Sequence, residues 1–410
     1  MPLLPLAEAQ ALVLSACHPL PVTEVALADA RGLVLGAEVR APDAVPPFDN
    51  TAMDGFAVRA VDTVGASEAT PVRLTISGTQ PAGPDRELVV GPGAAVRIMT
   101  GAPMPAGADA VVMVERSSRV GEEAVDLTLE VTAGTNVRRA GDDLQAGQQV
   151  LAPGAVLGPA GLGVLASIGL SHVPAHRRPR IGVFSTGDEL VPAGRPLRPG
   201  QIRDSNRTAL LALLERDGLT AVDLGLVADD EGRITEAIAD GVASCDALLT
   251  SGGVSMGDFD FVKVVLDRVA DMRWMQLAIK PAKPFAFGVV SDADRRVPVF
   301  GLPGNPVSSL VSYELLARPG LWRLLGRPDP VRTPVRAVAA ERLGRRVDGK
   351  DHFVRVVCRW SVDRGAYEVR SAGGQGSHQL SAMALADALA VLPDGDGIGV
   401  GDLVDVLLLT

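Results

Sequence analysis

Residues 246–270 read DALLTSGGVSMGDFDFVKVVLDRVA, an apolar strand followed by a glycine turn and an amphipathic helix. Three other apolar strands also run into helical patterns: RIGVFSTG (180–187), TAVDLGLV (220–227) and VPVFGLPG (297–304). Strands that alternate with helices predict a parallel sheet with helices on both faces. Polar loops follow these strands, and open sheets of this kind bind ligands at the carboxyl ends of their strands.

The regions on either side of this series have different patterns. Residues 5–17 and 158–169 are typical of short helices, and residues 66–139 contain strands separated by Gly, Pro and Asp turns. From about residue 329 short strands return, which favours a small C-terminal barrel or sandwich. The predicted fold class is therefore α/β plus β, in several domains, with a parallel-rich central sheet and a separate β-rich lobe.

Composition excludes several classes of protein. The 410 residues contain 39 Lys and Arg against 49 Asp and Glu, a net charge of −10, which argues against a generally basic nucleic-acid-binding surface. No uncharged apolar run approaches the roughly 20 residues of a membrane span. The N-terminal stretch carries Glu8 and has no basic region, so we expect a cytoplasmic protein without a secretory signal.

Residues that bind metals or form disulfides are scattered. HVPAHRRPR (172–180) indicates a linker, because Pro174 interrupts any helix that would place His172 and His176 on one face. No CxxC spacing links the three cysteines, Cys17, Cys245 and Cys358. The sequence therefore predicts neither a disulfide framework nor a zinc site.

The glycine turn at residues 250–261, TSGGVSMGDFDF, is a candidate phosphate-binding loop. Paired glycines let backbone N–H groups approach an anion, and the start of the following helix favours negative charge. Asp258 and Asp260 could add Mg²⁺, which prefers a few carboxylates together with phosphate oxygens. The alternative is a tight turn whose aspartates cap the helix.

IKPAKPFAFG (279–288) is a second candidate anion site. It holds Lys280 and Lys283, two of only four lysines, and each is followed by a proline that favours an extended conformation. Two ammonium groups held in this way suit phosphate or another oxyanion. A solvated loop with two ordinary lysines is the alternative.

Two further loops lie at the same predicted sheet edge. STGDEL (185–190) offers hydroxyls and carboxylates, and GLPGNPVSS (301–309) offers backbone amides with Ser308 or Ser309 at a helix start. Capping and rigid turns are the alternative interpretation of both. The chain has no GxxxxGK[ST], GxSxG or HExxH motif, so the enzyme classes that depend on these motifs lose support.

The β-rich lobe has three polar stretches of its own. They read PPFDNTAMDGFAVRA (46–60), RIMTGAPMPAGADAVVMVE (97–115) and NVRRAGDDLQAG (136–147). Taken singly, their Asp, Asn and Thr residues are explained by turn chemistry.

Taken together and in order, these segments resemble the molybdopterin molybdenumtransferase family, which includes bacterial MoeA and the E domain of gephyrin. The motifs span residues 46–309, and the domain pattern matches over essentially the whole chain. The resemblance implies an elongated homodimer with four parts in each subunit. These are a dimerisation region (1–45 and 141–176), a β-rich lobe (46–140), a molybdopterin-binding α/β domain (177–328) and a C-terminal β-barrel (329–410).

The resemblance also implies an activity. Members of the family insert molybdate into adenylylated molybdopterin with Mg²⁺-dependent release of AMP, which gives molybdenum cofactor. The expected partners are adenylylated molybdopterin and molybdate, a second copy of the chain and, by extension, a molybdopterin adenylyltransferase and acceptor molybdoenzymes.

Site residues follow from the same resemblance. The catalytic residues that it implies are Asp54, Thr100, Asp143, Glu189, Asp229 and Asp260, with Glu189 and Asp260 as metal ligands. The substrate-binding residues that it implies are Ser185, Thr186, Gly252, Gly253, Ser255, Lys280, Lys283, Pro303, Gly304, Asn305, Ser308, Arg355 and Ser377.

Two alternatives stay open. A molybdopterin adenylyltransferase has a similar α/β domain, but its glycine loop is closer to GGTG than to the GGVSMG found here, and it lacks the lobe and the barrel. The other alternative is a non-catalytic molybdopterin carrier or scaffold. The acidic residues and the paired lysines argue against it.

Overall fold

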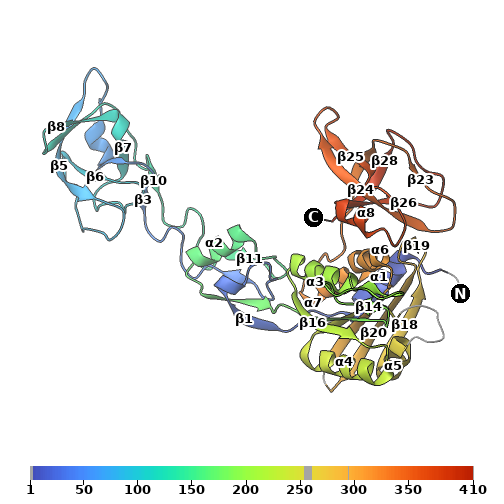
Figure 1. The fold of residues 1–410 in the computed structure, drawn as a ribbon. Helices are drawn as coiled ribbons and strands as arrows, with labels where there is room; N and C mark the ends of the chain where they lie inside the picture. Colours follow the sequence, from blue (N-terminus) through green and yellow to red (C-terminus); the bar gives the residue numbers. More distant parts are fainter. Residues whose placement is uncertain (1–2, 254–260, 294, 410) are drawn as a thin grey trace. The chain divides into compact units, whose positions relative to one another are not determined.

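The computed structural model describes residues 3–253, 261–293 and 295–409 and divides the chain into two compact units (Figure 1). The first unit combines Met1–Val25, Gly32–Gly36 and Pro174–Thr410, and the second combines Ala26–Arg31 and Ala37–Val173. The N-terminal residues therefore cluster with the α/β part of the chain. The division into four parts stays a prediction.

A six-stranded sheet forms the centre of the first unit. Its order is β16 (Thr220–Val227), β13 (Arg180–Thr186), β17 (Ala247–Ser251), β21 (Arg295–Leu302), β20 (Pro284–Asp292) and β18 (Ala270–Gln276). The first four strands are parallel, which confirms the parallel-rich sheet, and β20 runs antiparallel to its two neighbours, β21 and β18. Only a short connection joins β20 to β21, and such a connection cannot make the crossover that parallel strands need.

Helices cover both faces of this sheet. α4 (Glu231–Ser244) and α5 (Phe261–Val269) pack on one face, where Ile234, Leu248 and Val265 belong to one apolar cluster. The other helices, which Figure 1 places on the opposite face, are α3 (Asn206–Arg216), α6 (Pro306–Ser312), α7 (Arg318–Leu324) and α1 (Leu6–Ala16). A π turn (Tyr313–Ala317) joins α6 to α7, so the expected closing helix is continuous but contains an irregular turn.

The C-terminal strands close into a barrel. The order is β24 (Asp351–Ser361), β25 (Ala366–Ser371), β22 (Val335–Ala339), β28 (Leu403–Leu408) and β26 (Ala388–Leu392), and β26 pairs back with β24. Alternate residues such as Ala337, Val356 and Val406 fill the interior. The short strand β19 (Ile279–Lys280) extends the barrel sheet beside β24, although its residues come from the α/β part of the chain.

The second unit is built on another six-stranded sheet. Its order is β7 (Ala110–Met113), β4 (Gly55–Val58), β6 (Ala94–Ile98), β5 (Val72–Gln80), β9 (Ala124–Leu127) and β8 (Ser117–Val120). Phe56, Leu74 and Val112 lie in its apolar core. The strands expected in this lobe are therefore present, and α2 (Pro159–Ser167) matches the expected helix after it.

Short elements complete the fold. They are the pairs β2 (Val39–Arg40) with β11 (Gln149–Leu151), β3 (Asn50–Thr51) with β10 (Val137–Arg138), β14 (Leu190–Val191) with β15 (Ile202–Arg203) and β23 (Leu343–Gly344) with β27 (Gly397–Ile398), the helix α8 (Leu380–Leu385), and single 3₁₀ turns at Leu27–Asp29, Ala60–Thr63 and Val114–Arg116. Among the described residues, no helix is both long and apolar enough to cross a membrane.

The prediction of a linker at residues 172–180 is wrong for its first half. His172–His176 forms strand β12, which pairs with β1 (Val22–Ala26) in a two-stranded ribbon. Proline removes one donor from a strand but leaves its carbonyl able to pair. The carbonyl of Pro174 still accepts a bond from the N–H of Gly36 at 2.9 Å.

A buried ion cluster joins the α/β part to the barrel. The Glu314 side chain is 1% exposed and lies 2.7 Å from Arg216 Nη2 and 3.0 Å from Arg332 Nε. Arg332 also donates through Nη1 to the carbonyl of Leu408 at 2.6 Å, at the end of a barrel strand. Beside it Arg318, whose pKa burial lowers to about 10, lies 3.2 Å from Asp217.

Glu314→Gln therefore leaves Arg332 without its carboxylate and Arg216 with Asp217 alone, and we expect it to lower the free energy of unfolding by about 3 to 5 kcal/mol. Urea unfolding at neutral pH measures the loss. Glu236→Gln is the matched control, because the Glu236–Arg233 pair is about two-thirds exposed and such pairs contribute less than about 1 kcal/mol. Equal effects of the two changes would contradict the structural role of the cluster.

Candidate functional site

A cavity of about 520 Å³ opens at the carboxyl ends of β13 and β17, and we refer to it as the sheet-edge cavity. Six of the residues expected to form the site line it: Ser185, Thr186, Glu189, Gly252, Gly304 and Asn305. They come from three separate loops. The parallel strands bring these loops to one edge, as expected for an open α/β sheet.

The glycine turn makes this convergence possible. Gly252 has a φ of +98°, and a Cβ at that position would lie 2.9 Å from the carbonyl oxygen of Thr186. Gly253 has a φ of +73°, and a Cβ at that position would lie 2.4 Å from the Cβ of Val262 in α5. Only glycine permits both the backbone conformation and the contact. The end of β17 therefore lies directly against the end of β13.

Buried hydrogen bonds fix the three loops relative to one another. Ser185 donates through Oγ to Asp204 Oδ1 at 3.1 Å, and Arg207 Nε donates to Asp204 Oδ2 at 2.8 Å. Asn206 donates through Nδ2 to Ser251 Oγ at 2.8 Å and to the carbonyl of Gly304 at 2.7 Å. The sequence had indicated neither Asp204 nor Asn206 as a site residue.

An acidic group lies beside the cavity. Thr186 Oγ1 donates to Asp229 Oδ1 at 3.4 Å, and the N–H of Asp229 donates to Asp188 at the same distance. Burial, together with the charges of Asp188 and Glu189, raises the pKa of Asp229. In the described ranges no three His, Cys, Asp or Glu side chains converge on one metal position. Ser255 and Asp260, two expected site residues, lie outside the described residues.

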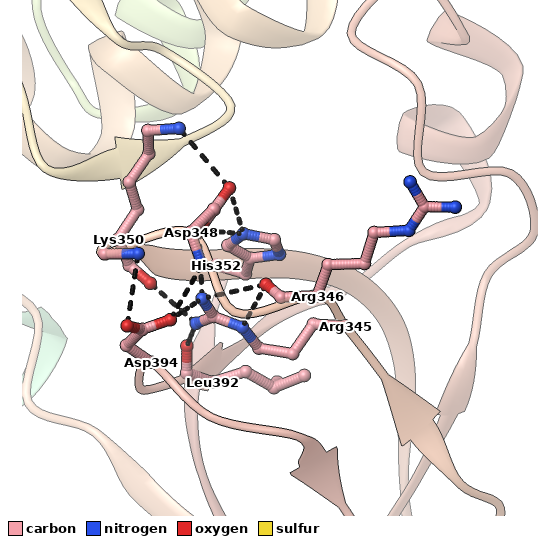
Figure 2. Close-up of polar contacts among 8 residues, drawn as sticks. Arg345, Arg346, Asp348, Lys350, His352, Leu392 and Asp394 are labelled. Atoms are coloured by element: carbon pink, nitrogen blue, oxygen red, sulfur yellow. Dashed lines mark hydrogen bonds and ion pairs between the residues drawn. The ribbon is translucent and has the colours of Figure 1, made fainter.

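A second cavity of about 600 Å³ lies against the barrel, and we refer to it as the barrel cavity. Its basic side chains are Lys280, Arg342, Arg345, Arg346 and Arg355, together with His352, whose pKa burial lowers. Arg345 is already occupied, because it donates to Asp348, Asp394 and the carbonyls of Lys350 and Leu392 (Figure 2). Arg346 extends away from this cluster (Figure 2).

Arg355 is fully buried, as is the side chain of Arg345, but unlike Arg345 it has guanidinium donors without a partner. Its Nη2 donates to the carbonyls of Gly374 and Gly376 at 2.7 and 3.2 Å, but Nε and Nη1 have no partner in the described part of the chain. Burial lowers its pKa. A buried guanidinium with two free donors is costly unless an anion pairs with it.

The two lysines of the IKPAKP segment are placed differently. Lys280 lies opposite His352 in the β19–β24 pairing and lines the barrel cavity. Lys283 is exposed and is not part of the lining of either cavity, whereas its carbonyl accepts the N–H of Leu277 at 2.7 Å. Ala282, between them, has a left-handed φ of 72° that alanine rarely adopts.

The remaining expected residues of the first unit support the loops. The carbonyl of Ser377 accepts a hydrogen bond from the N–H of Val307 at 3.0 Å. This bond attaches the barrel loop 373–379 to the start of α6. Pro303 and Ser308 are buried behind the sheet-edge cavity and are not part of its lining.

The expected residues of the second unit lie in its exposed turns. Asp54 accepts two bonds from Thr100, from the N–H at 2.7 Å and from Oγ1 at 2.8 Å, and these bonds lower its pKa. Asp143 is exposed, and its N–H donates to the carbonyl of Val45 at 2.9 Å.

Sequence reasoning missed the role of Asp49 in this unit. It accepts from the N–H of Ala140 at 2.9 Å and from Arg139 Nη1 at 2.6 Å, which lowers its pKa. It lies in the first of the polar stretches and joins that stretch to the third.

Comparison with known proteins covers nearly the whole chain. Residues 4–169 match the MoeA N-terminal region (domain I and II), 182–323 match a probable molybdopterin binding domain, and 337–409 match the MoeA C-terminal region (domain IV). A Mycobacterium tuberculosis protein named molybdopterin molybdenumtransferase 2 is 40% identical over 389 residues, with 93% of each chain covered. The Haemophilus influenzae molybdopterin molybdenumtransferase is 38% identical over 382 residues, covering 93% of this chain and 92% of the relative.

A solved structure has the same architecture. The molybdopterin biosynthesis MoeA protein from Pyrococcus horikoshii OT3 superposes with a TM-score of 0.81 at 28% identity, covering 99% of this chain and 100% of that chain. The multidomain α/β fold with a closed C-terminal barrel is therefore shared with that protein.

Thr100→Val removes one of the two bonds that Asp54 accepts, so the pKa of Asp54 should rise toward that of an ordinary aspartate. Carboxyl ¹³C NMR titration measures this shift. Asp126 serves as an internal control, since Arg73 lowers its pKa independently of Thr100. An unchanged pKa of Asp54 would show that the Thr100 hydroxyl does not bond to it in solution.

Proposed function

The chain belongs to the MoeA family, and from this premise we propose that it inserts molybdate into adenylylated molybdopterin and releases AMP. The matching family models and the shared name of the relatives support a transferase of molybdenum cofactor biosynthesis. Molybdopterin and molybdate are the substrates that such a name implies.

The observation that carries the proposal is the buried, incompletely paired guanidinium of Arg355. It lies in the wall of a cavity that also contains Lys280, and both groups suit a small oxyanion such as molybdate. This cavity is separate from the sheet-edge cavity, whose hydroxyls and glycine turn suit phosphate groups. Two anion sites are what a reaction between molybdate and a phosphoanhydride requires.

The residues beside the sheet-edge cavity are the proposed catalytic group. Cleavage of the anhydride adds water across a P–O–P link, so one new P–O bond forms, the bridging bond breaks, and AMP leaves. Thr186 and Asp229, which hydrogen-bond to each other, lie beside the expected position of the anhydride. The raised pKa of Asp229 suits a group that accepts a proton from water.

Mg²⁺ is the proposed metal. Carboxylate and hydroxyl oxygens are the ligands that it prefers, and Glu189, Asp188 and Asp229 provide such oxygens beside the sheet-edge cavity. Burial, together with the charges of Asp188 and Glu189, raises the pKa of Asp229, and a bound cation would offset both effects. Glu189 and Asp260 are the ligands that we propose. When bound, Mg²⁺ neutralises charge on the phosphates.

The second unit contributes three further proposed catalytic residues, Asp54, Thr100 and Asp143. Asp54 stays ionised well below neutral pH because Thr100 donates two bonds to it. We propose that the protein is a homodimer and that these residues act on the same substrate. An adenylyltransferase is disfavoured because the MoeA N-terminal and C-terminal regions are both present.

Release of AMP from purified adenylylated molybdopterin tests the proposal. We expect release that depends on Mg²⁺ and molybdate, and its loss, by at least about 100-fold, in Asp260→Asn, because a neutral amide binds Mg²⁺ poorly. Chromatographic detection of AMP measures the rate. Tight substrate binding without release by the unaltered protein would identify a carrier instead.

Arg355→Gln should raise the molybdate concentration needed for half-maximal AMP release by at least tenfold, because the oxyanion loses a charged partner. Affinity for adenylylated molybdopterin should not change. Arg359→Gln, on the same strand but with an exposed side chain, is the matched control. An unchanged molybdate requirement in a folded Arg355→Gln protein would rule out this assignment of the molybdate site.

A further inference from the structure

The sheet-edge cavity has no lysine in its described lining, although its expected occupant is an anion. Lys280 lines the other cavity, and Lys283 is not part of the lining of either one. Arg207 is near but already paired, with Asp204 at 2.8 Å and with Asp223 at 2.5 Å. Besides the proposed Mg²⁺, the phosphate groups therefore need positively charged or N–H-donating side chains from elsewhere in the lining.

Arg203 is one such group. It ends the short strand β15, which pairs with β14 beside the cavity, and its side chain is exposed there. The backbone around it is fixed, because the N–H of Ile202 donates to the carbonyl of Glu189 at 2.8 Å and that of Asp204 donates to the carbonyl of Val191 at 3.0 Å. In the described part of the chain no hydrogen bond or ion pair occupies its guanidinium.

His378 is the other group, and it comes from the barrel. The loop that carries it is tied to the α/β part by the bond from the N–H of Val307 to the carbonyl of Ser377 at 3.0 Å. Gln379 braces the loop internally by accepting the N–H of Gly376 at 2.6 Å. The exposed imidazole lines the sheet-edge cavity, and its ring nitrogens have no hydrogen bond to any described residue.

The charges of the lining show why these two side chains matter. Its ionisable groups are Glu189, Asp204, Arg203 and His378. Arg207 already neutralises Asp204, so without Arg203 the side chains of the described lining would carry only negative charge toward an anhydride that is itself negative.

We propose that Arg203 and His378 bind the phosphoanhydride of the substrate in the sheet-edge cavity. This inference rests on the proposed function and extends it to two residues that neither the motifs nor the family comparison assigned. The planar guanidinium donates two bonds to phosphate oxygens, and the imidazole donates one through its ring N–H. Ser185 and Thr186 face the same space from the sheet. The barrel thus contributes a substrate-binding residue to the α/β cavity.

Equilibrium binding of adenylylated molybdopterin, measured by calorimetry without molybdate, tests the proposal. Arg203→Ala and His378→Ala should each weaken binding by about tenfold or more, since each removes a donor to a charged group. Arg203→Lys and His378→Gln keep a donor and should recover part of the affinity. Arg198 lies in the connection between β14 and β15 but is not part of the cavity lining. Arg198→Ala should therefore bind the substrate with the affinity of the unaltered protein.

Inorganic pyrophosphate is the second probe, because it contains only the anhydride. Weaker pyrophosphate binding in both alanine variants, with unchanged binding in Arg198→Ala, supports the phosphate site even if the unaltered protein releases no AMP. If instead both alanine variants bind either probe as tightly as the unaltered protein does, the proposal is wrong. AMP release by the unaltered protein then leaves the proposed function intact.

Discussion

A carboxylate buried among arginines, Glu314, connects the α/β part of the first unit to its barrel, and both cavities depend on that connection. Arg216 approaches it from α3, and Arg332 approaches it from the segment that leads into the barrel. Removing a carboxylate from water is costly, and here the cost is offset by ion pairs and by bonds to the barrel carbonyls. The barrel is therefore held where its loops can reach the sheet edge and the Lys280 segment.

The two cavities have different linings, and each suits a different anion. The barrel cavity is rich in cations; Arg345 is occupied by neighbouring aspartates and carbonyls, whereas Arg355 keeps two free donors. The described lining of the sheet-edge cavity is richer in hydroxyls and backbone groups, and its basic side chains are Arg203 and His378. A compact oxyanion suits the first, where charge is concentrated and buried. A larger substrate with a phosphoanhydride suits the second, where donors are spread over three loops.

The sequence was informative where a local pattern decides the outcome. Alternating apolar and polar segments predicted the strands and helices of the α/β part, and the order of the polar loops predicted the edge at which a site lies. It was wrong at His172–His176, where Pro174 suggested a linker. A proline removes one donor but need not end a strand, and tertiary contacts decide whether the remaining backbone groups find partners.

The sequence by itself determined the α/β series, the β-rich lobe, the barrel and the family, because each rests on residues close together in the chain. Only the tertiary structure decided which side chains share a cavity. It separated Lys280 from Lys283, paired Lys280 with His352, and brought His378 across from the barrel to the loops after β13 and β17. These neighbours are set by strand pairing and by the docking of one part on another. Such contacts join residues tens to hundreds of positions apart, and no local periodicity encodes them.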